Sequence, residues 1–184
     1  MTELAEHGYA ALSLENVARR SGVHKATLYR RWGSREDLVL EAMLDRADVH
    51  IAVPNTGSLR EDLSALARTA AANAASPEVA AMARAVVAQA DHDPTLDAAR
   101  RRFWSARLAL DATIVERAIE RGDVPPETDP RMVIESIIGP IHLRLLLTGE
   151  PVDQAFLDNV VDTVLHGIDT TTGLGGRNRR GRLR

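Results

Sequence analysis

Residues 13–38 read S-L-E-N-V-A-R-R-S-G-V-H-K-A-T-L-Y-R-R-W-G-S-R-E-D-L. Ser13 is a residue type that caps helix N-termini, and Gly22 supplies the permissive backbone needed just after a helix ends. Leu28 and Trp32 continue an apolar pattern at helical spacing, and Gly33 ends it. We therefore predict two short helices around a glycine-containing turn, which is the helix-turn-helix pattern.

The polar side of this unit carries positive charge, with no acidic residue between Arg19 and Arg35. On the second helix, polar and aromatic side chains surround the two apolar positions, and such a helix suits the major groove of DNA. A solvated basic face on a small bundle is the alternative. The coincidence of the acid-free run with the helix-turn-helix spacing favours DNA binding. The positive residues are Arg19, Arg20, Lys25, Arg30, Arg31 and Arg35.

The composition is that of a globular helical protein. The chain has 184 residues, of which 45% are hydrophobic and 27% are charged. Aromatic residues are few while Ala, Leu and Val abound, which favours helices over strands. Because there is no cysteine, disulfides and thiolate metal sites are excluded. No apolar run is long enough to span a membrane and no signal peptide is evident, so we expect a cytoplasmic protein without membrane association.

The net charge is −3, but its distribution matters more than its total for DNA binding. Residues 49–170 carry more acidic than basic side chains, whereas positive charge gathers in residues 19–35 and in the C-terminal tail. A localised basic patch of this kind attracts phosphate despite the overall balance.

Capping residues, proline and glycine divide the chain into about nine predicted helices. Pro140 is predicted to bend the eighth helix. A break at residues 53–57 separates a helix-turn-helix DNA-binding domain, residues 1–50, from a helical domain, residues 51–170, and residues 171–184 form a disordered basic tail. Beyond the first helix, which ends within residues 1–10, and the two short helices, we predict helices over residues 35–49, from 58, 77–91, 93–121, 129–148 and 153–170.

Residues 8–38, G-Y-A-A-L-S-L-E-N-V-A-R-R-S-G-V-H-K-A-T-L-Y-R-R-W-G-S-R-E-D-L, resemble the DNA-binding domain of the TetR family of bacterial transcriptional regulators. The resemblance implies an all-α fold, with an N-terminal three-helix helix-turn-helix domain followed by a helical ligand-binding and dimerisation domain. It also implies that the helix over residues 35–49 links the two. Family members usually begin with a longer arm, so contacts of that arm are not carried over.

The resemblance also implies which residues contact DNA. Lys25, Ala26 and Tyr29 correspond to contacts with base edges or the nearby sugar-phosphate. Thr27, Arg30, Arg31 and Arg35 correspond to phosphate contacts, and Ser34 to a helix N-terminus that offers an amide to a phosphate.

The predicted eighth helix, residues 129–148, is apolar on nearly every side, and the predicted ninth helix, residues 153–170, adds a second apolar stripe. We expect these helices to pair with their copies as a four-helix bundle in a two-fold homodimer, which the resemblance also implies. The alternative is a monomer with an unusually apolar core. The predicted interface residues are Ile137, Ile138, Ile141, Leu145, Phe156, Val160, Val161, Val164 and Ile168. A dimer with one reading helix per subunit implies a near-palindromic operator with half-sites about 34–36 Å apart.

In the TetR family, helices five to eight enclose a ligand pocket, and the resemblance therefore implies a small-molecule effector. Arg107 either meets an anionic group of that ligand or extends its charged end to solvent. The candidate lining is otherwise apolar, so we expect a hydrophobic or amphipathic ligand. Its residues are Met82, Val86, Phe103, Trp104, Arg107, Leu108, Ile141 and His142.

No nucleophile with its base, P-loop or dinucleotide turn is evident, so we expect no enzyme, no catalytic residue and no cofactor. Asp91-His92-Asp93 is interpreted as a helix cap and not as a metal site. The predicted function is a ligand-responsive DNA-binding transcriptional regulator, with repression as the family's usual sign. The alternative is a helical protein–protein interaction module that uses the helix-turn-helix as a scaffold, and salt-dependent DNA binding distinguishes the two.

Overall fold

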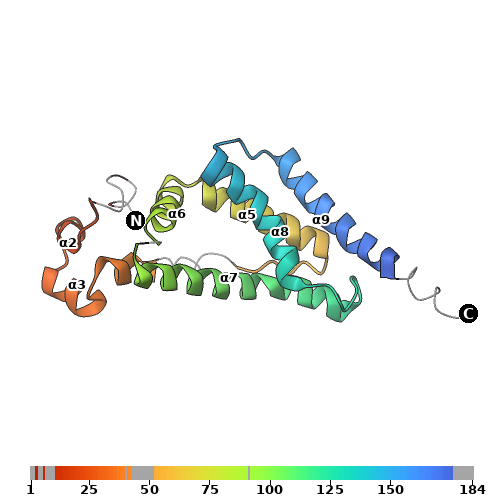
Figure 1. Ribbon diagram of the computed structural model, residues 1–184, viewed down its shortest axis with the longest axis horizontal. Coiled ribbons are helices and arrows are strands. Elements are labelled where there is room, and N and C mark those ends of the chain that lie inside the picture. The colour runs from red at the N-terminus through yellow and green to blue at the C-terminus, as the bar shows by residue number, and fades with distance from the viewer. Residues whose placement is uncertain are drawn as a thin grey trace, which may run out of the picture. The chain divides into compact units, whose positions relative to one another are not determined.

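The computed structural model describes Glu3, Glu6 and residues 11–39, 41–42, 52–90 and 92–175. These residues form helices joined by short loops and contain no strand, which confirms the predicted all-α class (Figure 1). Residues 35–39 and 41–42 are also helical, and residues 43–49 of that predicted helix lie outside the described residues. The helices are α2 (Leu14–Ser21), α3 (Lys25–Trp32), α5 (Leu59–Ala75), α6 (Pro77–Ala90), α7 (Pro94–Arg121), α8 (Pro130–His142), η1 (Leu143–Thr148) and α9 (Gln154–Gly175).

The helix-turn-helix is built by the local signals that predicted it. The Oγ atom of Ser13 accepts a hydrogen bond of 3.1 Å from the Asn16 amide at the start of α2. Gly22 ends α2 in the left-handed region, with φ of +72°, where a side chain would be strained. Ser34 Oγ accepts a bond of 3.0 Å from the Asp37 amide and so caps the next helical segment. As predicted, α2 begins after Ser13 and ends at Gly22, and α3 ends before Gly33.

The chain divides into two compact units. The first consists of Met1–Ala52 with Asn73–Arg107, and the second of Val53–Ala72 with Leu108–Arg184. The predicted domain boundaries at residues 50 and 170 divide the chain by function and stay predictions.

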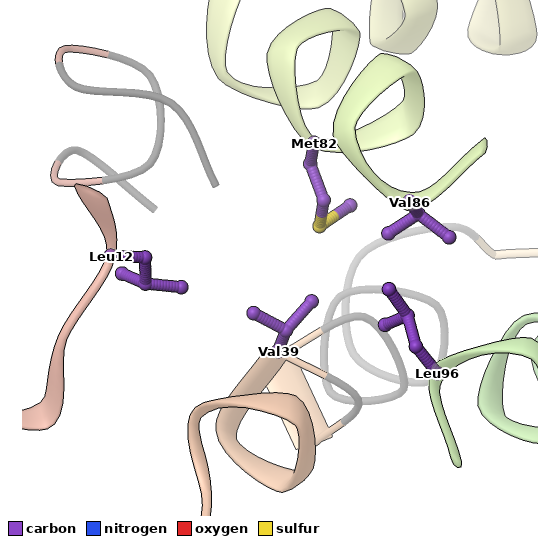
Figure 2. Close-up of a cluster of buried hydrophobic side chains, with 5 residues drawn as sticks. All are labelled: Leu12, Val39, Met82, Val86 and Leu96. Carbon is purple, nitrogen blue, oxygen red and sulfur yellow. The ribbon is translucent and has the colours of Figure 1, made fainter. Parts of the chain in front are cut away.

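The first unit contains two apolar clusters. The smaller cluster joins α2 to α3 through the buried residues Leu14, Ala18 and Leu28. The second, which we call the hinge cluster, consists of Leu12, Val39, Met82, Val86 and Leu96. Figure 2 shows the side chains of Val39, Val86 and Leu96 pointing towards one another from three different segments. Through the hinge cluster, the residues flanking the helix-turn-helix pack against α6 and the start of α7.

In the second unit, α8 packs against α9 (Figure 1). Ile134, Ile137 and Ile141 of α8 are fully buried, as is Val161 of α9. The loop that begins this unit is fastened by Asp62 of α5, whose Oδ1 atom accepts bonds from the Thr56 amide at 2.7 Å and hydroxyl at 2.8 Å. Residues 53–58 are not helical, which confirms the predicted break.

The end of the eighth helix differs from the prediction. The sequence predicts a continuous helix to Thr148, but α8 ends at His142 and Leu143–Thr148 form a π-helical turn. Pro140 lacks an amide hydrogen, which removes one bond of the α-helical ladder just before this point. The Leu143 amide is shared between the carbonyl groups of Gly139 and Pro140. The proline is thus followed by altered hydrogen bonding, in the wider turn that π-bulges use.

The ninth helix begins as predicted and ends later. The Oδ1 atom of Asp153 caps α9 by accepting a bond of 2.8 Å from the Phe156 amide. The sequence predicts that Thr171 to Gly175 belong to the disordered tail, but these residues are helical. The remaining predicted tail, residues 176–184, lies outside the described residues, as does most of the predicted first helix.

Asp93 acts as the predicted cap of α7, because its Oδ1 atom accepts bonds of 3.0 Å from the amides of Thr95 and Leu96. Asp91 is not among the described residues. Within the described part of the chain, no group of three or more histidine and acidic side chains is placed to hold a metal ion. None of the described helices combines the length and hydropathy that membrane crossing requires.

The hinge cluster predicts the effect of a core substitution. Leu96 of α7 is fully buried, so Leu96→Ala should lower the free energy of unfolding by about 2–5 kcal/mol. Leu110 lies on the same helix and is 42% exposed, so Leu110→Ala should change it by about 0.5 kcal/mol or less. Urea denaturation of both variants and the wild type at one protein concentration measures the difference. Equal losses in the two variants would contradict the cluster.

Candidate nucleic-acid interface

Helix α3 turns its polar side to solvent. Leu28 is 4% exposed and holds the opposite side against α2. Six of the eight predicted DNA-contacting residues are exposed and two, Ser34 and Arg35, are half-buried. The exposed ones are Lys25, Ala26, Thr27, Tyr29, Arg30 and Arg31. The structure therefore gathers the predicted contacts along one helix and the turn that follows it.

The N-terminal half of α3 is held by an acidic residue of α2. The Glu15 carboxylate pairs with the Lys25 ammonium and accepts hydrogen bonds of 3.2 and 3.4 Å from the Tyr29 hydroxyl. The Lys25 nitrogen also lies 5.4 Å from the centroid of the Tyr29 ring. The bond from Lys25 holds the pKa of Glu15 below its ordinary value, and the same bond raises the pKa of Lys25. Three side chains thus form one closed set on the exposed face.

The C-terminal half of α3 is held by Glu41. Its carboxylate pairs with Arg31 and accepts a bond of 2.7 Å from the indole nitrogen of Trp32. The Arg31 guanidinium lies 4.9 Å from the centroid of the Trp32 ring. The Arg31 guanidinium, followed by the Trp32 indole, lowers the pKa of Glu41. These contacts fix the end of α3 to the helical residues that follow it.

The other cations of the basic window differ in how freely they can meet phosphate. Arg30 is exposed and forms no ion pair or hydrogen bond with any described residue. Arg20 bonds Glu3 at 3.1 Å and pairs with Glu6, whose bond raises the pKa of Arg20. Arg35 pairs with Glu36 at 2.6 Å. Arg19 is also exposed, and its guanidinium bonds the neutral side-chain oxygen of Asn16 at 2.9 Å. Among the described residues, Arg19 and Arg30 can therefore reach a phosphate without first giving up an acidic partner.

Ser34 is engaged within the turn. Its hydroxyl donates to the Asp37 carboxylate at 2.7 Å, and its amide donates to the Trp32 carbonyl at 2.6 Å. A phosphate that uses the Ser34 amide, as predicted, must therefore replace the bond to Trp32.

Glu15 and Glu41 were missed by the sequence analysis. Both lie outside the acid-free window, and each meets α3 only because separate helical segments pack together. Glu15 occupies the first turn of α2, where a carboxylate is already favoured by the helix dipole. A glutamate at this position is explained by the helix dipole alone, so its contact with α3 was not predictable from the sequence.

The predicted ligand-pocket residues lie in both compact units. In the first, Met82 and Val86 belong to the hinge cluster, and Phe103 packs against it. The rings of Phe103 and Trp104 meet edge to face with centroids 5.2 Å apart. Arg107 is 6% exposed, so its charged end does not extend to solvent and that alternative is wrong.

In the second unit, Leu108 and Ile141 are buried, while His142 is half-buried and burial lowers its pKa. These placements leave the assignment of a pocket as a prediction.

A groove of about 630 Å³ runs between α8 and α9. Four of the predicted dimer residues, Phe156, Val160, Val164 and Ile168, line it, together with Met132 and Val133. The other predicted residues lie differently: Leu145 is half-buried in the π turn, whereas Ile137, Ile138, Ile141 and Val161 are buried within the subunit.

A basic helix held at both ends, exposed on its polar side and joined to a second helix of equal length through a glycine turn, defines a helix-turn-helix DNA-binding protein. Comparison with known proteins agrees. Residues 1–42 match the family described as bacterial regulatory proteins, tetR family, and residues 53–164 match the tetracyclin repressor-like C-terminal domain.

Individual relatives are similar over most of their length. The HTH-type transcriptional regulator AqdR of Rhodococcus erythropolis is 33% identical over 89% of this chain and 79% of its own. The DNA-binding transcriptional repressor TetR of Mycobacteroides abscessus is 33% identical over 88% of this chain and 85% of its own. The crystal structure of the TetR family transcription regulator SCO0332 is 34% identical, covers 91% of this chain and 92% of its own, and superposes with a TM-score of 0.74.

The chain therefore belongs to the TetR family of transcriptional regulators, whose members bind DNA. The names of these relatives are those of transcriptional regulators and indicate no enzymatic activity.

The Glu41 contacts predict a pH dependence. Because the pKa of Glu41 is lowered in the folded state, its stabilisation is complete above pH 4.5, the ordinary glutamate value, and is lost as pH falls through the lowered pKa. The wild type should therefore melt at a higher temperature than Glu41→Gln near pH 6, and the difference should shrink as the pH falls below 4.5. Thermal unfolding followed by circular dichroism measures it.

Glu116→Gln is the matched control, because Glu116 is exposed on α7 and pairs with no described residue. Its difference from the wild type should stay small across the same pH range. A Glu41→Gln difference that is independent of pH would contradict the ion pair.

Proposed function

We propose that this protein is a homodimeric repressor that binds a near-palindromic operator and is released by a hydrophobic or amphipathic effector in the cytoplasm. The repressor sign is supported by the name of the Mycobacteroides abscessus relative. The observation that carries the proposal is the exposed polar face of α3.

That face offers two kinds of contact. Lys25 and Tyr29 lie one helical turn apart and are already oriented by a shared carboxylate, so they suit base edges. Arg30, which is exposed and unpaired among the described residues, suits the phosphate backbone. In this proposal, the first pair reads sequence and Arg30 supplies affinity that does not depend on sequence.

The groove between α8 and α9 supports the homodimer. It is lined by apolar side chains from both helices, among them Met132, which is 59% exposed in the single subunit. Leu143 and Leu147, in the π turn, are also exposed, by 51% and 75%. An apolar surface of this kind is typical of an interaction site, and a second copy pairing the same two helices would cover it.

The hinge cluster supports coupling to an effector. Met82 and Val86 of α6 contact the same cluster as Leu12 and Val39, which flank the helix-turn-helix. A ligand that moves α6 would therefore move the reading helix as well, and two reading helices with altered spacing no longer match both half-sites.

Two residue classes on α3 test the DNA-reading assignment. Selection of genomic fragments by the purified protein, read by sequencing, should first yield a palindromic operator. Arg30→Ala should then weaken binding to operator and scrambled DNA alike and lower the salt slope by about 1 per subunit. Lys25→Ala should cost about 1–3 kcal/mol on the operator and reduce discrimination. Fluorescence anisotropy over a salt series measures both.

A selection that returns no motif, together with salt-independent binding, would favour the alternative of a helix-turn-helix used as a protein-binding scaffold. Equal loss of discrimination in both variants would contradict the division of roles between Lys25 and Arg30.

The dimer is tested by one acidic residue in the groove. Val164→Asp would bury an unpaired carboxylate in each subunit at a cost of several kcal/mol per ion, so the variant should sediment as a monomer of 20.0 kDa at micromolar concentration. Val87→Asp, at a residue of α6 that is 62% exposed, should remain dimeric like the wild type. A monomeric wild type would overturn the dimer.

A further inference from the structure

A carboxylate of α2 lies against the exposed face of α3, where a DNA-binding surface would be expected to carry only neutral and positive groups. Glu15 is exposed, with 48% of its side chain accessible, and it contacts both Lys25 and Tyr29. A carboxylate in this position repels the phosphates that approach the helix. It also neutralises one of the cations that would otherwise meet them.

We propose that Glu15 is a specificity-determining residue that sets how strongly α3 discriminates operator from other DNA. This inference rests on the proposed function, in which Lys25 and Tyr29 meet base edges. Glu15 fixes the two side chains in one arrangement, and it penalises any binding mode in which Lys25 leaves it for a phosphate.

The penalty falls unequally on the two kinds of DNA. On non-operator DNA, Lys25 gains only a phosphate contact, and its departure leaves an unpaired carboxylate beside the polyanion. On the operator, a base-edge acceptor takes a bond from a second N–H of Lys25, and the Tyr29 hydroxyl oxygen accepts a bond from a base amino group, both in the arrangement that Glu15 has already set. Less ordering is therefore required on binding. A residue that weakens binding to both kinds of DNA, but weakens non-operator binding more, raises specificity for the operator.

Glu41 does not share this role. It bonds Arg31 and the indole of Trp32, and Trp32 packs against the small cluster that joins α2 to α3. Its contacts therefore fix the end of the helix, whereas those of Glu15 fix two side chains of its exposed face.

The test is Glu15→Gln, which keeps the size of the side chain and an oxygen that accepts the Tyr29 hydroxyl, but removes the charge. Lys25 is then free to neutralise one more phosphate. The salt slope on scrambled DNA should become steeper by about 1 per subunit, and affinity for that DNA should rise on the order of tenfold. Operator affinity should rise less, so the operator-to-scrambled ratio should fall.

Glu61→Gln is the matched control. Glu61 also lies in the first turn of a helix, α5, is exposed, and has no side-chain partner among the described residues. The same loss of one negative charge there should leave both the slope and the ratio at the wild-type values.

Lys25→Ala provides the second test. In that background Glu15→Gln should no longer steepen the salt slope, because there is no ammonium to release. A slope that still steepens would overturn the role of Lys25 as the released group. Selective wild-type binding with an unaltered ratio in Glu15→Gln would overturn this inference alone. Absence of selective binding in the wild type would overturn the proposed function and this inference with it.

Discussion

The helix-turn-helix depends on the packing of a few apolar side chains in the hinge cluster. The helix-turn-helix has only a small interior of its own, and short segments with so little buried surface are marginally stable alone. It gains further burial by packing Leu12 and Val39 against α6 and α7 (Figure 2). Val17 of α2 touches both clusters and so joins the two interiors. The position of α3 is therefore tied to α6 through the flanking residues Leu12 and Val39 and through Val17 of α2.

That dependence limits how a ligand signal can reach DNA. Packed interiors shift between discrete arrangements and do not deform continuously. Met82, Val86 and Phe103 contribute to the hinge cluster, and the same three residues belong to the predicted ligand pocket. If a ligand occupies that region, it must displace side chains that hold the helix-turn-helix in place. The same hinge-cluster contacts would then stabilise the helix-turn-helix and respond to the ligand. This shared use is a physical basis for coupling between ligand and DNA.

Local signals were sufficient for much of the fold, because caps and breakers act within one turn of the chain. Ser13, Gly22 and Asp153 mark helix ends that the structure reproduces. Contacts between separate segments were not predictable in the same way. The bonds of Glu15 to α3 depend on how two helices pack, and so does the burial of Arg107, whose long side chain is equally compatible with solvent from sequence alone. The effect of Pro140 was predictable as a disturbance of the helix, but not as a π turn three residues later.

The ion pairs on α3 reduce how strongly its positive side chains can attract DNA. Lys25 and Arg31 both have carboxylate partners before any DNA arrives, and these pairs lower the pKa values of Glu15 and Glu41, which favours the charged carboxylates. In the proposed complex, a contact of Lys25 or Arg31 with a phosphate would exchange one anion for another, with a gain much smaller than the full attraction of a free cation. The exchange is favourable only where base edges or well-placed phosphates bind the side chain more strongly than the carboxylate does. If α3 reads DNA as proposed, it would gain less from electrostatics at random sites, and its sequence-independent attraction would come mainly from cations without an acidic partner among the described residues, such as Arg30.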